Sequence, residues 1–199
     1  MNIARWLRRG LALMLLLGSA AAVAEPQAYR LDPVHTRIVF KVGHNGFSSV
    51  MGSFSKPSGR LWFDREDWAA SRLEVQVDLA TLDLGDAVFN ARILERRWLD
   101  AEAHPQARFV SERIEPLGPD RARVHGRLSL RGVEAPLVLD VRLNRLARTP
   151  YNGMRRTAGF SASAVLSRAA FGIKAHPRAV GDAVTLMVEA EAVGIRGED

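Results

Sequence analysis

Residues 40–54 read FKVGHNGFSSVMGSF, and apolar residues alternate with polar ones on both sides of a glycine-containing bend that carries a histidine. Alternation with a period of two is typical of a β-strand that has one apolar face. We therefore predict a strand, a tight turn and a second strand, whose apolar face carries Phe40, Val42, Phe47, Val50 and Phe54. This face borders either a solid core or a ligand cavity.

Five later segments alternate in the same way, and short connections rich in Gly and Pro separate several of them. The residues predicted to share one face within each segment are Leu73, Val75, Val77 and Leu79; Val124, Gly126, Leu128 and Leu130; Leu137, Leu139, Val141 and Leu143; Phe160, Ala162, Ala164 and Leu166; and Val184, Leu186, Val188 and Ala190. About eight antiparallel strands with hairpin spacing predict an all-β fold, either a sandwich or an up-and-down barrel.

Residues 86–98 have helical spacing instead. Ala87, Ala91, Leu94 and Trp98 recur at i, i+4, i+7 and i+11, and Asp86 is placed to cap the first turn. We predict a short helix around 86–98 that packs against the sheet. Pro105 then returns the chain to extended structure.

Residues 1–24 have the composition of a secretory signal peptide: three arginines precede an apolar run, and Ala22-Val23-Ala24 provides small residues for cleavage. The apolar run is shorter than the roughly 20 residues that span a bilayer. We expect a mature chain of residues 25–199, folded as a single domain in the periplasm. The pair Arg8-Arg9 leaves a twin-arginine route as the alternative to ordinary secretion.

Composition excludes several classes of protein. The chain has no cysteine, so disulfides, thiolate catalysis and a lipoprotein anchor are excluded. Removing Arg5, Arg8 and Arg9 from 28 basic residues leaves 28 − 3 = 25 against 22 acidic ones, a mature net charge of +3. Such a small and dispersed charge is not typical of a nucleic-acid-binding protein.

Searches for catalytic motifs give weak signals. The segments starting at Gly46 and Gly159 begin like nucleophile elbows but lack the closing glycine. The five histidines show no metal-ligand spacing, and the carboxylates of Asp64, Glu66 and Asp67 match no calcium loop. A hydrolase acting on an amphiphilic ester or amide, with His44 and either Ser48 or Ser161, is retained as an alternative. A scaffold with a filled core is a third.

Small residues on predicted inward faces favour an open interior. A barrel of about eight strands encloses a volume that side chains either fill or leave free for one small ligand. We expect a tunnel beside Gly126, Ala162, Ala164 and Ala190.

Several motifs, in order and over nearly the whole mature chain, resemble those of the YceI-like family of bacterial secreted polyisoprenoid-binding proteins. They are Tyr29-x-Leu-Asp32-x-x-His35-Thr36; Phe40-x-Val42-x-His44-Asn45-Gly46-Phe47-Ser48; Val50-x-Gly52-x-Phe54; Trp98-Leu99-Asp100 with Pro105 and Phe109-Val110-Ser111; Gly126-x-Leu128-x-Leu130-x-Gly132-Val133; and Arg168-x-x-Phe171-Gly172. One position departs: many members carry Arg-Asp-x-His early in the helix, where this chain has Phe89-Asn90-Ala91-Arg92.

The resemblance implies a lipocalin-like extended antiparallel β-barrel that holds a long isoprenoid, of quinone or polyprenyl type, as its ligand. It implies no catalytic activity, no metal and no other cofactor. Contact with a membrane surface is expected to be transient, and a homodimer is an open alternative. The residues predicted to bind the ligand are Phe40, Val42, His44, Asn45, Phe47, Val50, Phe54, Val75, Val77, Arg92, Trp98, Phe109, Leu128, Phe160 and Phe171, with His44, Asn45 and Arg92 near an opening.

Overall fold

The computed structural model describes residues 25–195, so the predicted signal peptide lies outside the described residues. Within this range the chain forms one antiparallel sheet, one α-helix and four short 3-10 helices. The strands are β1 (Gln27–Leu31), β2 (Arg37–His44), β3 (Ser48–Ser55), β4 (Ser58–Phe63), β5 (Arg72–Asp78), β6 (Leu82–Asp83), β7 (Gln106–Gly118), β8 (Arg121–Leu130), β9 (Val133–Arg148), β10 (Arg156–Ser167) and β11 (Val180–Gly194). The helices are η1 (Trp68–Ala70), η2 (Leu79–Thr81), α1 (Ala87–Leu94), η3 (Pro150–Asn152) and η4 (Ala169–Phe171).

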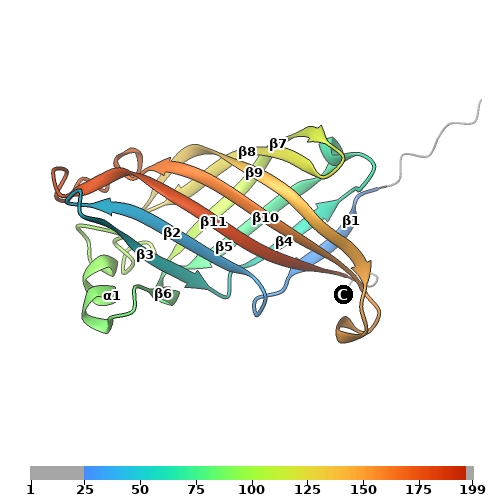
Figure 1. Cartoon of the computed structure of the whole chain (residues 1–199), viewed down its shortest axis with the longest axis horizontal. Coiled ribbons are helices and arrows are strands. Elements are labelled where there is room, and N and C mark those ends of the chain that lie inside the picture. Colours follow the sequence, from blue (N-terminus) through green and yellow to red (C-terminus); the bar gives the residue numbers. More distant parts are fainter. Residues whose placement is uncertain (1–24, 196–199) are drawn as a thin grey trace, which may run out of the picture.

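Eight strands close into a barrel in the order β1-β4-β5-β7-β8-β9-β10-β11, and the pairing of β1 with β11 completes the circuit. This confirms the predicted eight-stranded antiparallel barrel. Strands β2, β3 and β6 continue the sheet from the other part of β11. The barrel is long in one direction, with α1 at the end that carries β2, β3 and β6, and β1 toward the opposite end (Figure 1).

Strand β11 changes its partner along its length, and this creates a branch in the sheet. Residues Ala192–Gly194 pair with β1, whereas residues Val180–Glu189 pair with β2. The intervening Glu191 is bonded to the turn between β1 and β2, where its backbone oxygen accepts from the backbone N–H of Asp32 at 2.8 Å. The branch widens the barrel at the α1 end because β2, β3 and β6 enter the wall there.

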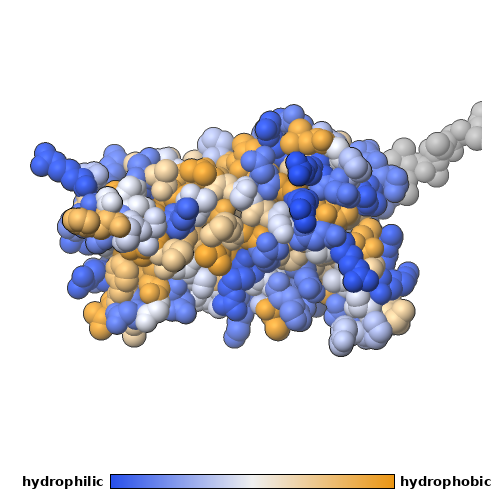
Figure 2. Space-filling model, viewed as in Figure 1, coloured by the Kyte–Doolittle hydropathy of each residue, from blue (hydrophilic) through white to orange (hydrophobic). Residues whose placement is uncertain are grey.

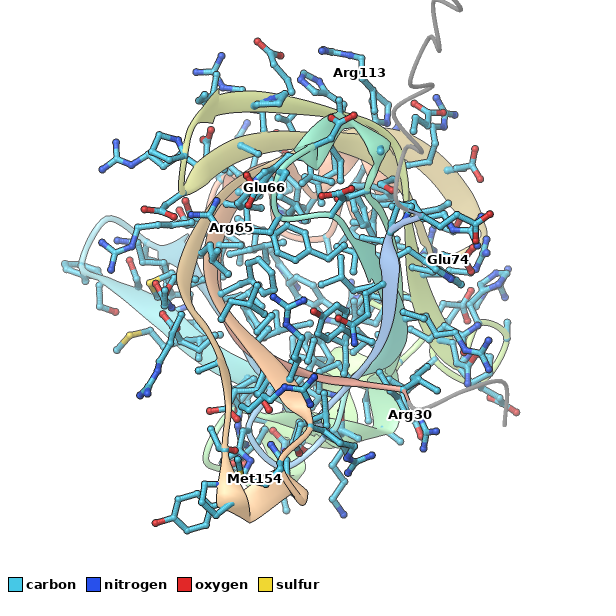
Figure 3. All side chains as sticks on the ribbon, turned by 90° about the vertical axis from the view of Figure 1, so that its right-hand side faces the viewer. Arg30, Arg65, Glu66, Glu74, Arg113 and Met154 are labelled. Atoms are coloured by element: carbon cyan, nitrogen blue, oxygen red, sulfur yellow. The ribbon has the colours of Figure 1, made fainter. Side chains whose placement is uncertain are left out.

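The alternating segments place their apolar residues inside, as predicted. Leu73, Val75 and Val77 of β5, Phe160 and Ala162 of β10, and Leu186, Val188 and Ala190 of β11 line interior space. Charged side chains such as Glu74 and Arg113 lie outside, as the end-on view shows (Figure 3). The period of two therefore decides which side chains reach the interior.

The predicted helix is present but shorter. Asp86 caps it, with its Oδ1 accepting from the backbone N–H of Phe89 at 2.7 Å, and the helix ends at Leu94 rather than Trp98. The predicted apolar face was right for Leu94 and Trp98, which pack against the core, and wrong for Ala87 and Ala91, which are exposed. Phe89 and Ile93 face the interior instead. No helix within residues 25–195 is both long and apolar enough to cross a bilayer.

One expected source of free space is filled. A Cβ added to Gly126 would meet the backbone oxygen of Val110 first and then Cζ of Phe109 at 2.6 Å, so the neighbouring strand and this aromatic ring together occupy the space beside the glycine. Ala162 and Ala190 border a cavity, whereas Ala164 is buried without doing so. The interior is therefore open beside two of the four small residues expected to leave it open.

Candidate functional site

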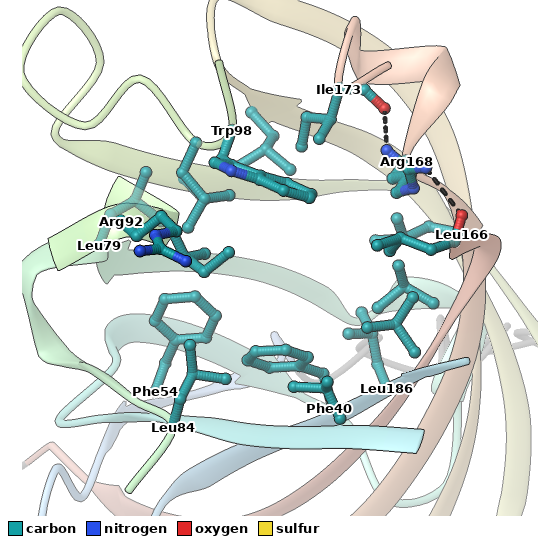
Figure 4. A pocket seen from close by; sticks show the side chains of 18 of the residues that line it. Phe40, Phe54, Leu79, Leu84, Arg92, Trp98, Leu166, Arg168, Ile173 and Leu186 are labelled. Carbon is teal, nitrogen blue, oxygen red and sulfur yellow. Dashed lines mark hydrogen bonds between the residues drawn. The ribbon is translucent and has the colours of Figure 1, made fainter. Parts of the chain in front are cut away.

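A cavity of about 580 Å³ opens at the α1 end of the barrel, and we call it the mouth cavity. Its walls come from β2, β3, β11, α1 and the residues that follow α1. Phe40 and Phe54 form one apolar side, with ring centroids 5.6 Å apart. Figure 4 shows these two rings with Leu84 opposite Arg92, Trp98 and Arg168. A volume of this size falls within the range of small-molecule sites.

A second cavity of about 170 Å³ lies deeper in the barrel, and we call it the inner cavity. Phe63, Trp68 and Phe160 form an aromatic cluster in its wall, with edge-to-face contacts between centroids 5.1 to 6.4 Å apart. The indole Nε1 of Trp68 is buried without a hydrogen-bond partner among the described residues. One donor therefore lies unused in an otherwise apolar wall.

The two cavities adjoin. The side chains that border both form what we call the waist: Ile38, Val77, Ala107, Leu128 and Leu186. All five are apolar, and they come from strands around the barrel. A ligand longer than the mouth cavity would reach the inner cavity by passing these side chains.

Charged groups border only the mouth cavity. Arg92 and Arg97 come from α1 and the turn after it, Arg168 from the end of β10, and Glu95 is the single acid among the lining residues. The inner cavity, in contrast, has only Thr36 and Ser71 as hydroxyl residues in its lining, and both are already hydrogen-bonded. The polar end of an amphiphile therefore fits the mouth better than the interior.

Arg168 is a buried cation, with 5% of its surface exposed. Its guanidinium donates to three backbone oxygens: Nε to Gly181 at 2.8 Å, Nη1 to Ile173 at 2.7 Å and Nη2 to Val180 at 2.8 Å. These bonds fix the segment between β10 and β11 that forms one rim of the mouth. Asp182 lies nearby, and the pKa of its carboxyl group is lowered. The largest cause is a hydrogen bond from Ser167, the next is the backbone N–H of Ala169, and the Arg168 charge has a smaller effect.

The histidines of the rim lie against other rim groups. His176 stacks on Trp98 with centroids 6.0 Å apart, and His44 Nε2 is 3.2 Å from Nδ2 of Asn45. Both histidines border the mouth cavity and are exposed. No side-chain hydrogen bond joins His44 to Ser48 or Ser161 within the described part of the chain.

Most residues predicted to bind a ligand do border the cavities. The mouth cavity is lined by Phe40, Val42, His44, Val50, Phe54, Val77, Arg92, Trp98 and Leu128, and the inner cavity by Val75, Val77, Phe109, Leu128 and Phe160. Their contact with a ligand stays a prediction.

Three predicted residues border neither cavity. Phe47 is 92% exposed in the turn between β2 and β3, because the alternation ends where the turn begins. Its neighbour Asn45 is exposed in the same turn, with a φ of 51° that points to a left-handed turn conformation. Phe171 is 2% exposed and belongs to the packed core.

The sequence reasoning missed Ile38, Ala107, Leu186 and Arg168 as lining residues. Ile38 continues the alternation of Phe40 and Val42, and Leu186 already belonged to a predicted inward face. The alternation could therefore have predicted both as lining residues. Arg168 belonged to a recognised motif, but no periodicity shows that an arginine between two strands turns inward. Only the fold shows it.

The two serines of the hydrolase alternative differ in their distance from His44, because Ser48 lies directly opposite His44 in the β2–β3 ladder and Ser161 lies far away. Ser161 pairs with Glu189 on β11, whereas His44 pairs with Val180, nine residues away on the same strand. At about 3.3 Å per residue this separation is roughly 25–30 Å. Ser161 donates to Oε2 of Glu189 at 2.8 Å and accepts from Asn144, on the outer face.

Asp32, His35 and Glu191 form the one group within residues 25–195 with the ligand types and spacing of a metal site, their ligand atoms lying within 4.8 Å of one another. His35 Nδ1 is already 2.9 Å from Oδ2 of Asp32. None of the three borders either cavity. Their contacts hold the branch of the sheet.

The family model of the YceI-like domain matches residues 29–192. A curated relative, a "UPF0312 protein" of Pseudomonas savastanoi pv. phaseolicola, is 32% identical over 159 residues, which cover 80% of this chain and 82% of the relative. A second, from Pseudomonas putida, is 32% identical over 184 residues, covering 90% of this chain and 94% of the relative.

Solved structures share the fold. The crystal structure of Burkholderia cenocepacia BcnA superposes with a TM-score of 0.73 at 24% identity, covering 81% of this chain and 98% of that one. A polyisoprenoid binding domain from Saccharophagus degradans, described as implicated in plant cell wall breakdown, gives a TM-score of 0.68 at 15% identity, with 85% and 99% covered.

Proposed function

This chain belongs to the YceI-like family, and from that premise we propose that it is a binding or carrier protein for a long-chain isoprenoid or similar apolar lipid. The observation that carries the proposal is the pair of adjoining apolar cavities along the barrel, of about 580 and 170 Å³. The Saccharophagus domain with the same fold is named as polyisoprenoid-binding, which supports this ligand class. A quinone or a polyprenyl lipid has the required chemistry.

The transfer free energy of an apolar tail favours a carrier that exchanges lipid with membranes and does not release it into water. Each CH₂ group removed from water stabilises the bound state by about 0.8 kcal/mol, so a long tail stays in the barrel when only water is available. A bilayer offers hydrocarbon as apolar as the cavity wall. Exchange with a membrane is therefore close to balanced, and it is the step by which such a protein loads and unloads.

The proposal places this exchange at the α1 end. Phe47 and Val88 are 92% and 70% exposed, in the β2–β3 turn and at the start of α1. His44 and Val50, at the ends of the strands that flank this turn, and Phe89, next to Val88, line the mouth cavity. Apolar surface occurs at this end of the molecule (Figure 2). Exposed aromatic and aliphatic side chains of this kind insert into the boundary between headgroups and acyl chains.

The proposed location is the periplasm, reached through a signal peptide of residues 1–24, with residues 25–199 as one lipid-binding domain. There the barrel would carry lipid between membrane surfaces without a nucleic-acid partner, a metal or a catalytic step. The separation of Ser161 from His44 along β11 argues against hydrolysis by that pair, and Ser48, although opposite His44, forms no side-chain hydrogen bond with it among residues 25–195.

Extraction of the protein from its native compartment tests the proposal. The protein is purified without detergent, extracted with organic solvent and analysed by mass spectrometry, and the delipidated protein is then titrated with a quinone. We expect an isoprenoid lipid near one molecule per chain, or uptake of the added quinone to that level. The absence of both results contradicts the proposal.

A further inference from the structure

The charge of the mouth cavity is unbalanced. Three guanidinium groups border it, those of Arg92, Arg97 and Arg168, against the single carboxylate of Glu95. Across residues 25–195 none of these four side chains forms an ion pair within 4.0 Å, although seven such pairs occur elsewhere. Arg92, Arg97 and Glu95 also have no side-chain hydrogen bond there. No ion pair therefore neutralises these arginines, although the charges of Arg168 and the nearby Asp182 carboxylate interact.

The guanidinium of Arg168 is buried among mostly apolar residues of the mouth cavity. A guanidinium has five N–H donors and stays protonated in proteins. Three of its donors are bonded to the backbone oxygens of Ile173, Val180 and Gly181, which are neutral groups. Two N–H groups have no hydrogen-bond partner among residues 25–195, and an ionised acceptor would form the stronger kind of hydrogen bond with them.

The basic groups lie around the cavity away from its most apolar wall. Figure 4 shows Arg92 and Arg168 on different sides, with Trp98 between them, and Phe40, Phe54 and Leu84 along the wall below. Cζ of Arg168 lies 6.0 Å from the centroid of the Trp98 ring. A headgroup placed here meets cations, whereas a tail placed over the Phe40 side continues along apolar side chains to the waist.

We propose that the arginines bordering the mouth cavity, Arg92, Arg97 and Arg168, bind an anionic headgroup, a phosphate ester or a carboxylate, at the end of the apolar tail. The inference rests on the proposed function and adds the ligand class: an anionic amphiphile is preferred over a neutral one with the same tail. Opposite charges close to a low-dielectric wall attract more strongly than in water, and an arginine fork matches an oxyanion in shape.

Two ligands that have the same tail and different headgroups test the preference for an anionic headgroup. Delipidated protein is titrated with geranylgeranyl phosphate and with geranylgeraniol, by calorimetry at 50 mM and 500 mM NaCl. We expect the phosphate to bind at least about tenfold more tightly at 50 mM NaCl, with an advantage that shrinks at 500 mM. Equal affinities at low salt overturn the headgroup inference and leave lipid binding intact. Failure of both probes to bind, with no quinone uptake, overturns the proposed function itself.

Inorganic phosphate separates a lipid headgroup from a free ion. We expect it to bind at least about a hundredfold more weakly than geranylgeranyl phosphate, because it gains nothing from the apolar wall. Phosphate that binds as tightly as the lipid overturns the assignment to an amphiphile.

Charge variants locate the preference. Arg92→Gln/Arg97→Gln should lower the ratio of the two affinities at least about fivefold, and Glu95→Gln should raise it. The matched control is Arg142→Gln/Arg145→Gln, which removes two exposed charges from β9 that do not border the cavity. A ratio unchanged in the first variant, or lowered equally in the control, overturns the assignment to the mouth arginines. Arg168 is left unchanged because its loss would release the rim segment that it holds.

Discussion

The hydroxyl of Thr36 bonds to the backbone N–H and oxygen of Glu191, where neither β1 nor β2 pairs with β11. Oγ1 of Thr36 accepts from the backbone N–H of Glu191 and donates to its backbone oxygen, each at 3.3 Å. Thr36 is 2% exposed and lies where β11 passes from β1 to β2. This side chain therefore supports the branch that widens the barrel into the mouth cavity.

Thr36→Val should lower the free energy of unfolding by about 1–3 kcal/mol, because it leaves the N–H and the oxygen of Glu191 without this partner while keeping the shape. Urea denaturation measures the change. Thr185→Val is the control, since its hydroxyl has no hydrogen-bond partner among residues 25–195, and we expect a change within about 0.5 kcal/mol. Equal effects of the two substitutions would contradict a role of Thr36 at the branch.

The stability supplied by the Asp32–His35 pair should depend on pH. The hydrogen bond to Asp32, then the charges of Asp32 and Glu191, raise the pKa of His35. Partial burial acts to raise the pKa of Asp32, but hydrogen bonds from His35 and the backbone outweigh it and lower that pKa. The His35 contribution is therefore complete below its ordinary pKa of 6.5 and is lost as pH rises through the raised value. The Asp32 contribution is complete above 3.8 and is lost as pH falls through the lowered value.

Urea midpoints of the wild type and His35→Gln at pH 5.5 and pH 8.5 measure this dependence. We expect the wild type to be favoured more strongly at pH 5.5. The same substitution in an Asp32→Asn background should show little of this difference, because the partner carboxylate is gone. A difference in urea midpoint between the wild type and His35→Gln that is larger at pH 8.5 than at pH 5.5 would contradict the interpretation.

Two glycines in neighbouring parts of the sheet should respond in opposite ways to alanine. Gly126→Ala should destabilise the protein by about 1–3 kcal/mol, because the new Cβ would clash with the backbone oxygen of Val110 and lie 2.6 Å from the Phe109 ring. Gly159→Ala should be neutral or slightly stabilising, since the nearest atom to its Cβ is 4.0 Å away and alanine lowers the entropy of the unfolded chain. Thermal and urea unfolding of both variants test the contrast, and similar losses would contradict the assigned packing.

Blocking the waist should shorten the tail that the barrel accepts. Ala107 borders both cavities and is 9% exposed, so Ala107→Phe places a ring between them. We expect the affinity for geranylgeraniol to fall at least about tenfold and that for the shorter geraniol to change less than about threefold. Circular dichroism checks that the variant is folded. Equal affinities of the wild type and the variant for geranylgeraniol would show that the tail does not pass the waist.

Exposed aromatic residues at the two ends should differ in their effect on lipid exchange. Phe47→Ser should slow transfer of a bound lipid to vesicles several-fold, because less apolar surface enters the bilayer boundary. Tyr151→Ser is the matched control: Tyr151 is 97% exposed, in η3 between β9 and β10, away from the mouth cavity. A stopped-flow transfer assay that finds both variants equal to the wild type would contradict docking through the mouth.

Much of the barrel could be predicted because a strand presents alternate residues to opposite faces. Val75, Phe160 and Leu186 lie inside as the alternation required, and Asp86 caps α1 as its position before the helix indicated. Where the alternation stops, the prediction failed: Phe47 was assigned to the interior but lies exposed in the turn.

The helix shows a second limit of local patterns. Ala87 and Ala91 matched a helical stripe, yet the interior is contacted by Phe89 and Ile93. A short helix over a cavity buries little of its surface, so its spacing alone does not indicate which face turns inward.

The amino-acid sequence by itself determined the strands, their apolar faces and the family, because these depend on residue type and on spacing along the chain. The tertiary structure decided which space stays open. Phe109 fills the place beside Gly126, and Arg168 turns into the mouth because β11 passes its carbonyl oxygens beside the end of β10. Closure of the sheet brings residues far apart in the sequence together, and no local pattern specifies that distance.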